Sequence, residues 1–94
     1  KVEAGDKLAY ATMCGFSNDW FYANEQAIPA GSNGDITGKT ALLDSGTGVD
    51  QYPGAGNRQA LFGGTPQAES KPISKVGNTF PVPSVDKVLK ITIK

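Results

Sequence analysis

The pattern of apolar residues in the first quarter of the chain predicts two β-strands. The segment from Lys7 to Cys14 is apolar at alternate residues, and its opposite face is also largely apolar, which favours a central strand covered on both sides. Its alanines would also tolerate a short helix, and the periodicity of so short a run does not separate the two. The aromatic run Trp20 to Ala23 has a strong strand preference and predicts the second strand.

Further strands are expected later in the chain. Lys39 to Leu43 predicts a short strand, and Pro72 to Val76 a weak edge strand. The prolines of Phe80 to Pro83 require extended backbone at a sheet margin. Val85 to Lys94 is expected to be the clearest strand, because Leu89, Ile91 and Ile93 alternate with polar residues. Val88 is out of phase with this pattern, which is typical of a bulge.

The long segment from Asp44 to Gly64 shows neither a strand nor a helix period. Loops of this length in small domains are usually functional or disordered, and we interpret this one as an ordered binding loop. Two glycine pairs in it, and the run 33–40 before it, resemble parts of nucleotide-binding loops, but no helix can follow them. Ordinary tight turns explain these glycines better.

Composition narrows the class of protein. With 94 residues, 12 glycines and 6 prolines, the chain is expected to form a single all-β domain over residues 1–94. Nine basic residues balance nine acidic ones, so no nucleic-acid partner is expected. The apolar runs are too short to predict a membrane span, and no signal-peptide pattern is visible in the given residues. Histidine is absent and cysteine occurs once, which removes histidine acid–base chemistry, thiolate zinc sites and intrachain disulfides.

Three aspartates are the candidate site residues. Asp19, Asp44 and Asp50 lie at predicted strand ends or in the glycine-rich loop, where carboxylates and turned carbonyls could together ligate a hard cation such as Ca²⁺. The spacing is not that of an EF-hand. The competing interpretation is that each aspartate only hydrogen-bonds its own turn. An exposed platform formed by the aromatic run is a further alternative, although at least one of its rings should supply core.

Several short motifs resemble the later half of the spondin N-terminal domain, including its secreted bacterial members. These motifs are Gly5-Asp6-Lys7-Leu8 with Ala11-Thr12-Met13, Ser17-Asn18-Asp19-Trp20-Phe21, Leu43-Asp44-Ser45-Gly46-Thr47, and the closing run from Val85 to Ile93. The resemblance implies a C2-like antiparallel β-sandwich with roles in extracellular matrix and cell adhesion, and a calcium ion held by loop acids. It matches Asp19 and Asp44 to the ligand-bearing motifs. Gly48 stands where relatives tend to have an acid, and Asp50 is the candidate substitute.

The resemblance also implies that the sandwich is incomplete within this chain, because about five strands are predicted where such a sandwich needs about eight. The missing strands would come from a separate chain, from a cleaved first half that stays associated, or from neighbouring copies in a fibre. The last predicted strand, with Leu89, Ile91 and Ile93, would be a donor or acceptor in each case.

Two functions are therefore expected. The first is a secreted, extracellular, non-enzymatic adhesion or matrix-binding module with a structural Ca²⁺ at Asp19, Asp44 and Asp50. The alternative is a structural subunit of an extracellular filament assembled by strand addition between chains. An enzyme that uses the carboxylates with a metal is a third and weaker hypothesis, because no histidine is available as a base.

Overall fold

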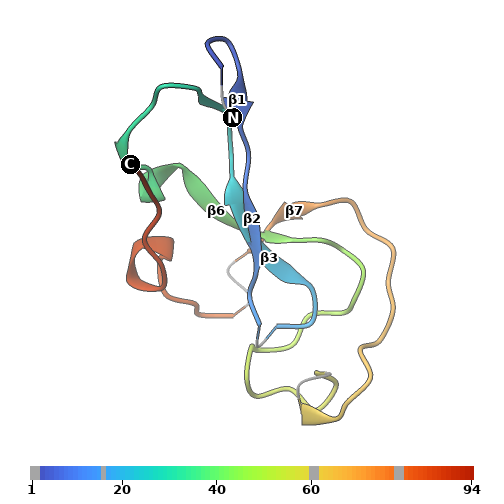
Figure 1. Ribbon diagram of the computed structural model, residues 1–94. Coiled ribbons are helices and arrows are strands. Elements are labelled where there is room, and N and C mark those ends of the chain that lie inside the picture. The colour runs from blue at the N-terminus through green and yellow to red at the C-terminus, as the bar shows by residue number, and fades with distance from the viewer. Residues whose placement is uncertain (1–2, 16, 60–61, 78–79) are drawn as a thin grey trace.

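The computed structural model describes residues 3–15, 17–59, 62–77 and 80–94, and these form a mostly β structure (Figure 1). All strand pairs are antiparallel, and the described residues contain no α-helix, which confirms the predicted antiparallel β character. The molecule is elongated, with extents of 46 × 26 × 23 Å. Its radius of gyration is 15.1 Å, against about 12 Å for a compact domain of this length.

The central sheet has four strands in the order β2 (Ala11–Met13), β3 (Trp20–Asn24), β6 (Thr40–Asp44) and β7 (Ser74–Lys75). The aromatic and β-branched residues of β3 and β6 favour this conformation. Their pairing aligns Trp20 with Asp44 and Tyr22 with Leu42. The predicted strands at 20–23 and 39–43 and the predicted edge strand at 72–76 are confirmed to within a few residues.

Two smaller sheets lie beyond the central one. One pairs β1 (Lys7–Leu8) with β4 (Ile28–Pro29), and the other pairs β5 (Gly34–Asp35) with β8 (Thr92–Ile93). The 3₁₀ turns η1 (Thr37–Lys39) and η3 (Val85–Lys87) contact each other. In Figure 1 the end with β1 lies opposite the long loop after β6.

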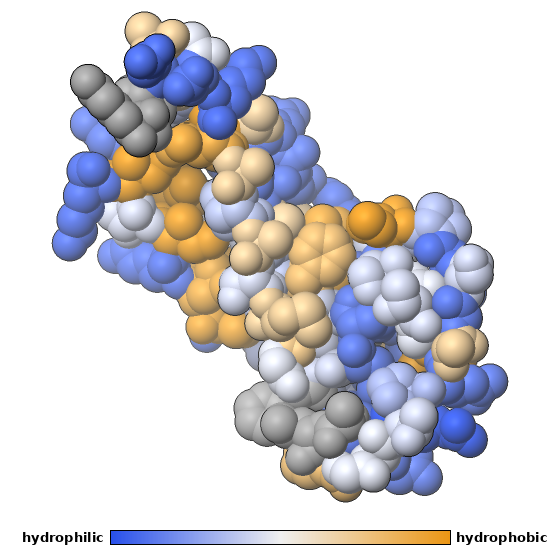
Figure 2. Space-filling model, turned by 45° about the vertical axis from the view of Figure 1, so that its right-hand side comes forward, coloured by the Kyte–Doolittle hydropathy of each residue, from blue (hydrophilic) through white to orange (hydrophobic). Residues whose placement is uncertain are grey.

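Only a small set of apolar side chains is buried in the described residues. They are Trp20, Tyr22, Ile28, Ile36 and Ala41. Trp20 contacts Phe80, whose ring also meets Tyr52 edge-on, with 6.2 Å between centroids in both pairs. Because Trp20 and Tyr22 are buried, the alternative of an exposed aromatic platform is wrong. Figure 2 shows a band of apolar surface on one face of the molecule.

Two strand predictions need correction. The segment from Lys7 to Cys14 is not one central strand, because it divides into β1 and β2 and β2 is an edge strand of the sheet. The amide of Tyr10 between them donates to the side-chain Oδ1 of Asn24 (2.9 Å) instead of to a strand backbone. The chain changes partner at this point, from β4 to β3.

The segment from Val85 to Lys94 was expected to be the clearest strand, and this is mostly wrong. It begins with the η3 turn, where the amide of Leu89 donates to the Val85 carbonyl (3.0 Å), and only Thr92–Ile93 pair in a strand. The short β5 offers just two residues for pairing. Residues 80–83 contain no strand. No helix in the described part of the chain has the length and apolar character needed to cross a membrane.

Candidate metal centre

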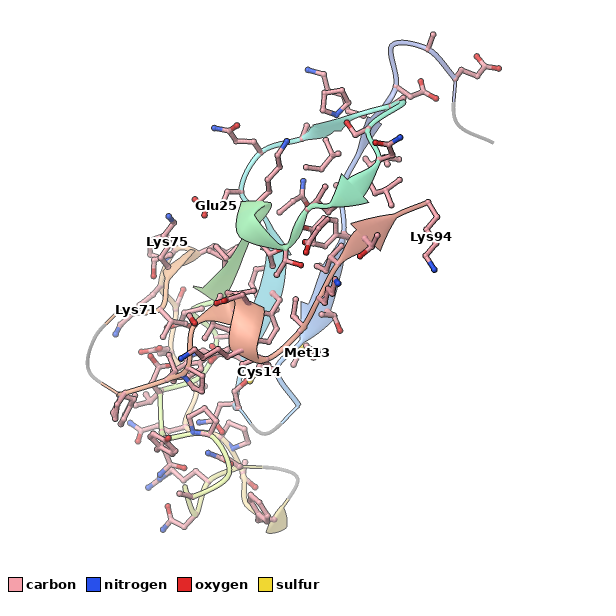
Figure 3. The ribbon with its side chains drawn as sticks, turned by 90° about the vertical axis from the view of Figure 1, so that its left-hand side faces the viewer. Met13, Cys14, Glu25, Lys71, Lys75 and Lys94 are labelled. Atoms are coloured by element: carbon pink, nitrogen blue, oxygen red, sulfur yellow. The ribbon has the colours of Figure 1, made fainter. Side chains whose placement is uncertain are left out.

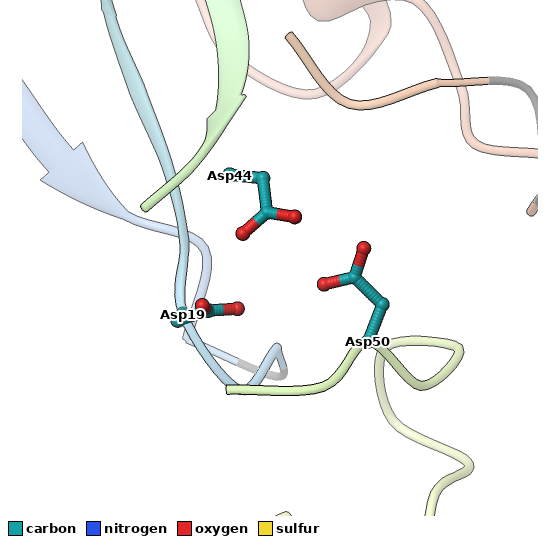
Figure 4. Close-up of side chains that lie close together, drawn as sticks. All are labelled: Asp19, Asp44 and Asp50. Carbon is teal, nitrogen blue, oxygen red and sulfur yellow. The ribbon is translucent and has the colours of Figure 1, made fainter. Parts of the chain in front are cut away.

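The three aspartates predicted from the sequence come together at one end of the central sheet. Asp19 immediately precedes β3 and Asp44 is the last residue of β6, so the pairing of Trp20 with Asp44 places these two side by side. Asp50 comes from the loop, where its Oδ1 accepts a hydrogen bond from the Trp20 indole Nε1 (2.8 Å). One carboxylate oxygen from each residue lies within 4.8 Å of the others, and Figure 4 shows the three carboxylates facing a common space.

Asp19 is the most constrained of the three. Its side chain is 6% exposed, and its Oδ2 accepts hydrogen bonds from the amides of Thr47 and Gly48, both at 2.8 Å, and from the Thr47 hydroxyl at 3.3 Å. The second oxygen, Oδ1, is buried and has no hydrogen-bond partner among the described residues. A buried carboxylate oxygen without a partner is costly, so this atom is suited to a cation.

Asp44 bonds its own turn and also faces the cluster. Its Oδ1 accepts a hydrogen bond from the amide of Gly46 (2.8 Å), which is the bond within its own turn that the competing interpretation predicted. The pKa of the Asp44 carboxyl is raised to about 6, first by burial and then by the negative charges of Asp19 and Asp50, against the lowering effect of the Gly46 amide. The three acids therefore repel one another, and a divalent cation between them would remove that repulsion.

The glycine at position 46 allows the loop to close over the acids. Gly46 has φ = +79°, and a Cβ at this position would collide with the carbonyl of Lys71. The same contact is used for pairing, because the Lys71 amide donates to the Gly46 carbonyl (3.0 Å). A single bridge between Gly48 and Ala68 continues this pairing. The loop predicted from Asp44 to Gly64 is thus tied to the segment before β7, and its residues 60 and 61 lie outside the described residues.

One neighbouring side chain was not among the sequence candidates. The Nδ2 of Asn18 donates to the Val49 carbonyl (2.7 Å), while its Oδ1 is buried with no hydrogen-bond partner in the described part of the chain. Amide oxygens are also ligands for hard cations. The position of Asn18 directly before Asp19 in the sequence was the signal that could have identified it as a candidate ligand. Consecutive residues, Asn18 and Asp19, therefore each have a buried oxygen with no hydrogen-bond partner among the described residues.

No lysine or arginine side chain in the described ranges forms an ion pair with Asp19, Asp44 or Asp50. Lys71 lies in the paired segment, but its Nζ forms an ion pair with Glu69 (3.1 Å) and its side chain is 68% exposed. Glu69 is the main cause of the raised pKa of Lys71, with smaller contributions from Asp50 and Asp44. An exposed lysine paired elsewhere leaves the charge of the cluster largely uncompensated.

The ligand set favours a hard cation over a transition metal. All three candidate ligands are carboxylates, and the chain contains no histidine. Ca²⁺ takes six to eight oxygens in flexible geometry, so backbone carbonyls and water could complete the coordination of an ion held by the three carboxylates.

An open pocket of about 220 Å³ is separate from this cluster, because it is lined by Glu25, Gln26, Gly38 and Lys39.

Comparison with known proteins adds no relative. The chain matches no protein-family model, no curated protein and no solved structure at a significant level.

Proposed function

We propose that the chain is a secreted, non-enzymatic binding module, similar to the spondin N-terminal domain, with a structural Ca²⁺ held by Asp19, Asp44 and Asp50. The observation that carries the metal site is the buried Oδ1 of Asp19, which lacks a hydrogen-bond partner among the described residues and belongs to the three-carboxylate cluster. In this proposal the antiparallel sheets are part of an extracellular C2-like β-sandwich used for adhesion or matrix binding.

The cation would hold the long loop against the sheet. Asp19 and Asp44 lie at the ends of β3 and β6, whereas Asp50 lies in the loop, so one ion bound by all three would cross-link these segments. Binding only to the folded state stabilises it by RT ln(1 + [L]/Kd), which is about 2.7 kcal/mol when free Ca²⁺ is a hundred times Kd. The small buried core makes such a contribution important.

Calcium-dependent thermal stability tests this site. We expect millimolar CaCl₂, added to metal-free protein, to raise Tm by roughly 10–20 °C for a domain of this size, and EGTA to reverse the shift. Asp19→Asn should abolish the calcium response, because it removes the charge but keeps the shape of the side chain. Asp86→Asn is the matched control, since Asp86 is an exposed aspartate in η3, and it should retain the full shift. Equal Tm values with and without calcium in the unsubstituted protein would reject the metal site.

A second candidate function is a subunit of an extracellular assembly joined by strand addition. The observation that favours it is the outer strand β2, whose three residues are all exposed at the edge of the central sheet. The elongated shape and the small core also suit a chain that is completed by another strand.

A further inference from the structure

Among the described residues, the outer edge of β2 has backbone groups that no other strand pairs with. The Cys14 amide donates to the Trp20 carbonyl (3.0 Å), so Cys14 and Thr12 direct their backbone groups toward β3. In an antiparallel ladder, alternate residues direct theirs to opposite sides. Ala11 and Met13 therefore direct their N–H and C=O groups away from the sheet, where β2 has no neighbouring strand among the described residues.

Among the described strands, β2 is the one edge without a protecting residue. Natural edge strands often carry proline, lysine or another charged residue, each of which hinders pairing with further strands. Such residues are present at every other described edge: Lys7 in β1, Pro29 in β4, Asp35 in β5, Lys75 in β7, and Lys90 and Lys94 flanking β8. By contrast, no charged residue or proline occurs between Leu8 and Asn18. Figure 3 shows Lys71 and Lys75 together, away from Met13 at the end of β2.

The side chains beside this edge form an apolar surface. Met13, Phe21 and Leu43 are in register across β2, β3 and β6 and therefore share one face of the sheet. Met13 is 63% exposed, and Phe21 and Leu43 are half-buried. A strand added at β2 would cover part of Met13 and continue this face.

We propose that the β2 edge pairs antiparallel with the β2 edge of a second copy of this chain. A two-fold axis at Thr12 would pair Ala11 of each copy with Met13 of the other, so that each large side chain lies opposite a small one. The chain has a formal net charge of zero, and the edge is uncharged, so two copies meet without repulsion.

A single unprotected edge predicts a closed dimer and not a fibre. A fibre needs two complementary edges on each copy, and the opposite edge of this sheet is β7, which carries Lys75 and is preceded by Pro72. The inference rests on the strand addition of the second candidate function and replaces open-ended assembly with a discrete pair. It is independent of the calcium site, which lies at the ends of β3 and β6.

Sedimentation equilibrium of the 94-residue chain tests the proposal. Between about 1 and about 500 µM, the range expected for a small interface, we expect the mass to rise from 9.8 kDa to twice that value and no further. Met13→Lys should raise the dimer dissociation constant roughly 10- to 100-fold, because it removes apolar burial and places like charges close together. Ile73→Lys is the matched control, since Ile73 is 64% exposed but precedes β7, and it should leave dimerisation unchanged.

Amide hydrogen exchange gives a second readout that does not require a substitution. The amides of Ala11 and Met13 should become protected at high concentration, because pairing would bury them. A monomer at all concentrations, an open-ended polymer, or a dimer equally sensitive to both substitutions would overturn the proposal. The thermal shift with CaCl₂ is measured separately, so loss of the dimer and loss of the metal site give different results.

Discussion

At the scale of single residues, the two oxygens of Asp19 have different roles. Oδ2 holds the loop through the amides of Thr47 and Gly48, while the buried Oδ1 has no hydrogen-bond partner among the described residues. One carboxylate therefore both positions the loop and presents an oxygen to the cluster. An aspartate that only capped its own turn would bond within a few residues, as Asp44 does with Gly46.

Asp44 gives the metal-free protein a pH dependence of defined sign. Its pKa is raised from the ordinary value of 3.8 to about 6, chiefly by burial and further by its acidic neighbours. The folded state thus binds more protons than the unfolded state between these values, and the free energy of unfolding falls as pH rises through this window. We expect Tm in metal-free buffer to decrease from about pH 4 to pH 6 through this group.

Calcium should reverse this trend, because a bound cation favours the ionised carboxylates and its affinity increases as they lose their protons. Tm measured across the same pH range with and without CaCl₂ checks both signs. Asp44→Asn should flatten the metal-free profile. A metal-free Tm that instead rises steadily over this range in the unsubstituted protein would contradict the assigned effect of Asp44.

At the scale of elements, the close approach of the loop to the segment before β7 depends on Gly46. Alanine at this position would need a left-handed backbone, at about 1–2 kcal/mol, and its Cβ would also collide with the Lys71 carbonyl. Gly63 has the same φ of +79°, but a Cβ added there would meet nothing within 4 Å, so Gly63→Ala isolates the backbone cost.

Gly46→Ala should therefore lower the free energy of unfolding by more than Gly63→Ala, by about 1–3 kcal/mol, and should also weaken calcium binding. Urea denaturation of the two variants measures the difference. Equal losses would mean that the contact with Lys71 has no energetic role.

The sequence predicted the elements with internal signals and missed those that depend on a partner. The strands β3 and β6 carry aromatic and branched residues, and both were predicted. Residues 89–93 alternate between apolar and polar, but the backbone of this segment finds only two residues of β5 to pair with. The side chain of Asn24, which separates β1 from β2, acts from another strand and leaves no local signal in 7–14.

The candidate site was predictable in composition but not in geometry. Their positions at predicted strand ends or in the glycine-rich loop indicated Asp19, Asp44 and Asp50 as oxygen ligands. Their proximity depends on the register of Trp20 with Asp44 and on the bond from the Trp20 indole to Asp50. Neither can be read from local spacing. The buried oxygen of Asn18 became a candidate only through its burial and its lack of a hydrogen-bond partner in the described ranges.

At the scale of the whole molecule, the body is elongated and few apolar side chains are buried in the described residues. At one end of the molecule, hydrogen bonds to Asp19 and the pairing near Gly46 hold the long loop. The other end carries the two-stranded sheets. With so few buried side chains, added strands and a bound cation are two sources of further stability.

The hydrogen bond between Trp20 and Asp50 should make the intrinsic fluorescence of the protein sensitive to calcium binding. Trp20 is the only tryptophan of the chain, and it is buried. Its indole N–H donates a hydrogen bond to Asp50, one of the three carboxylates. Calcium titration should therefore change the intensity or wavelength of its emission, and Trp20→Phe should remove the signal. Asp50→Asn should weaken the response while leaving a buried, fluorescent indole, so that a single ring reports on the ion, the docked loop and the core together.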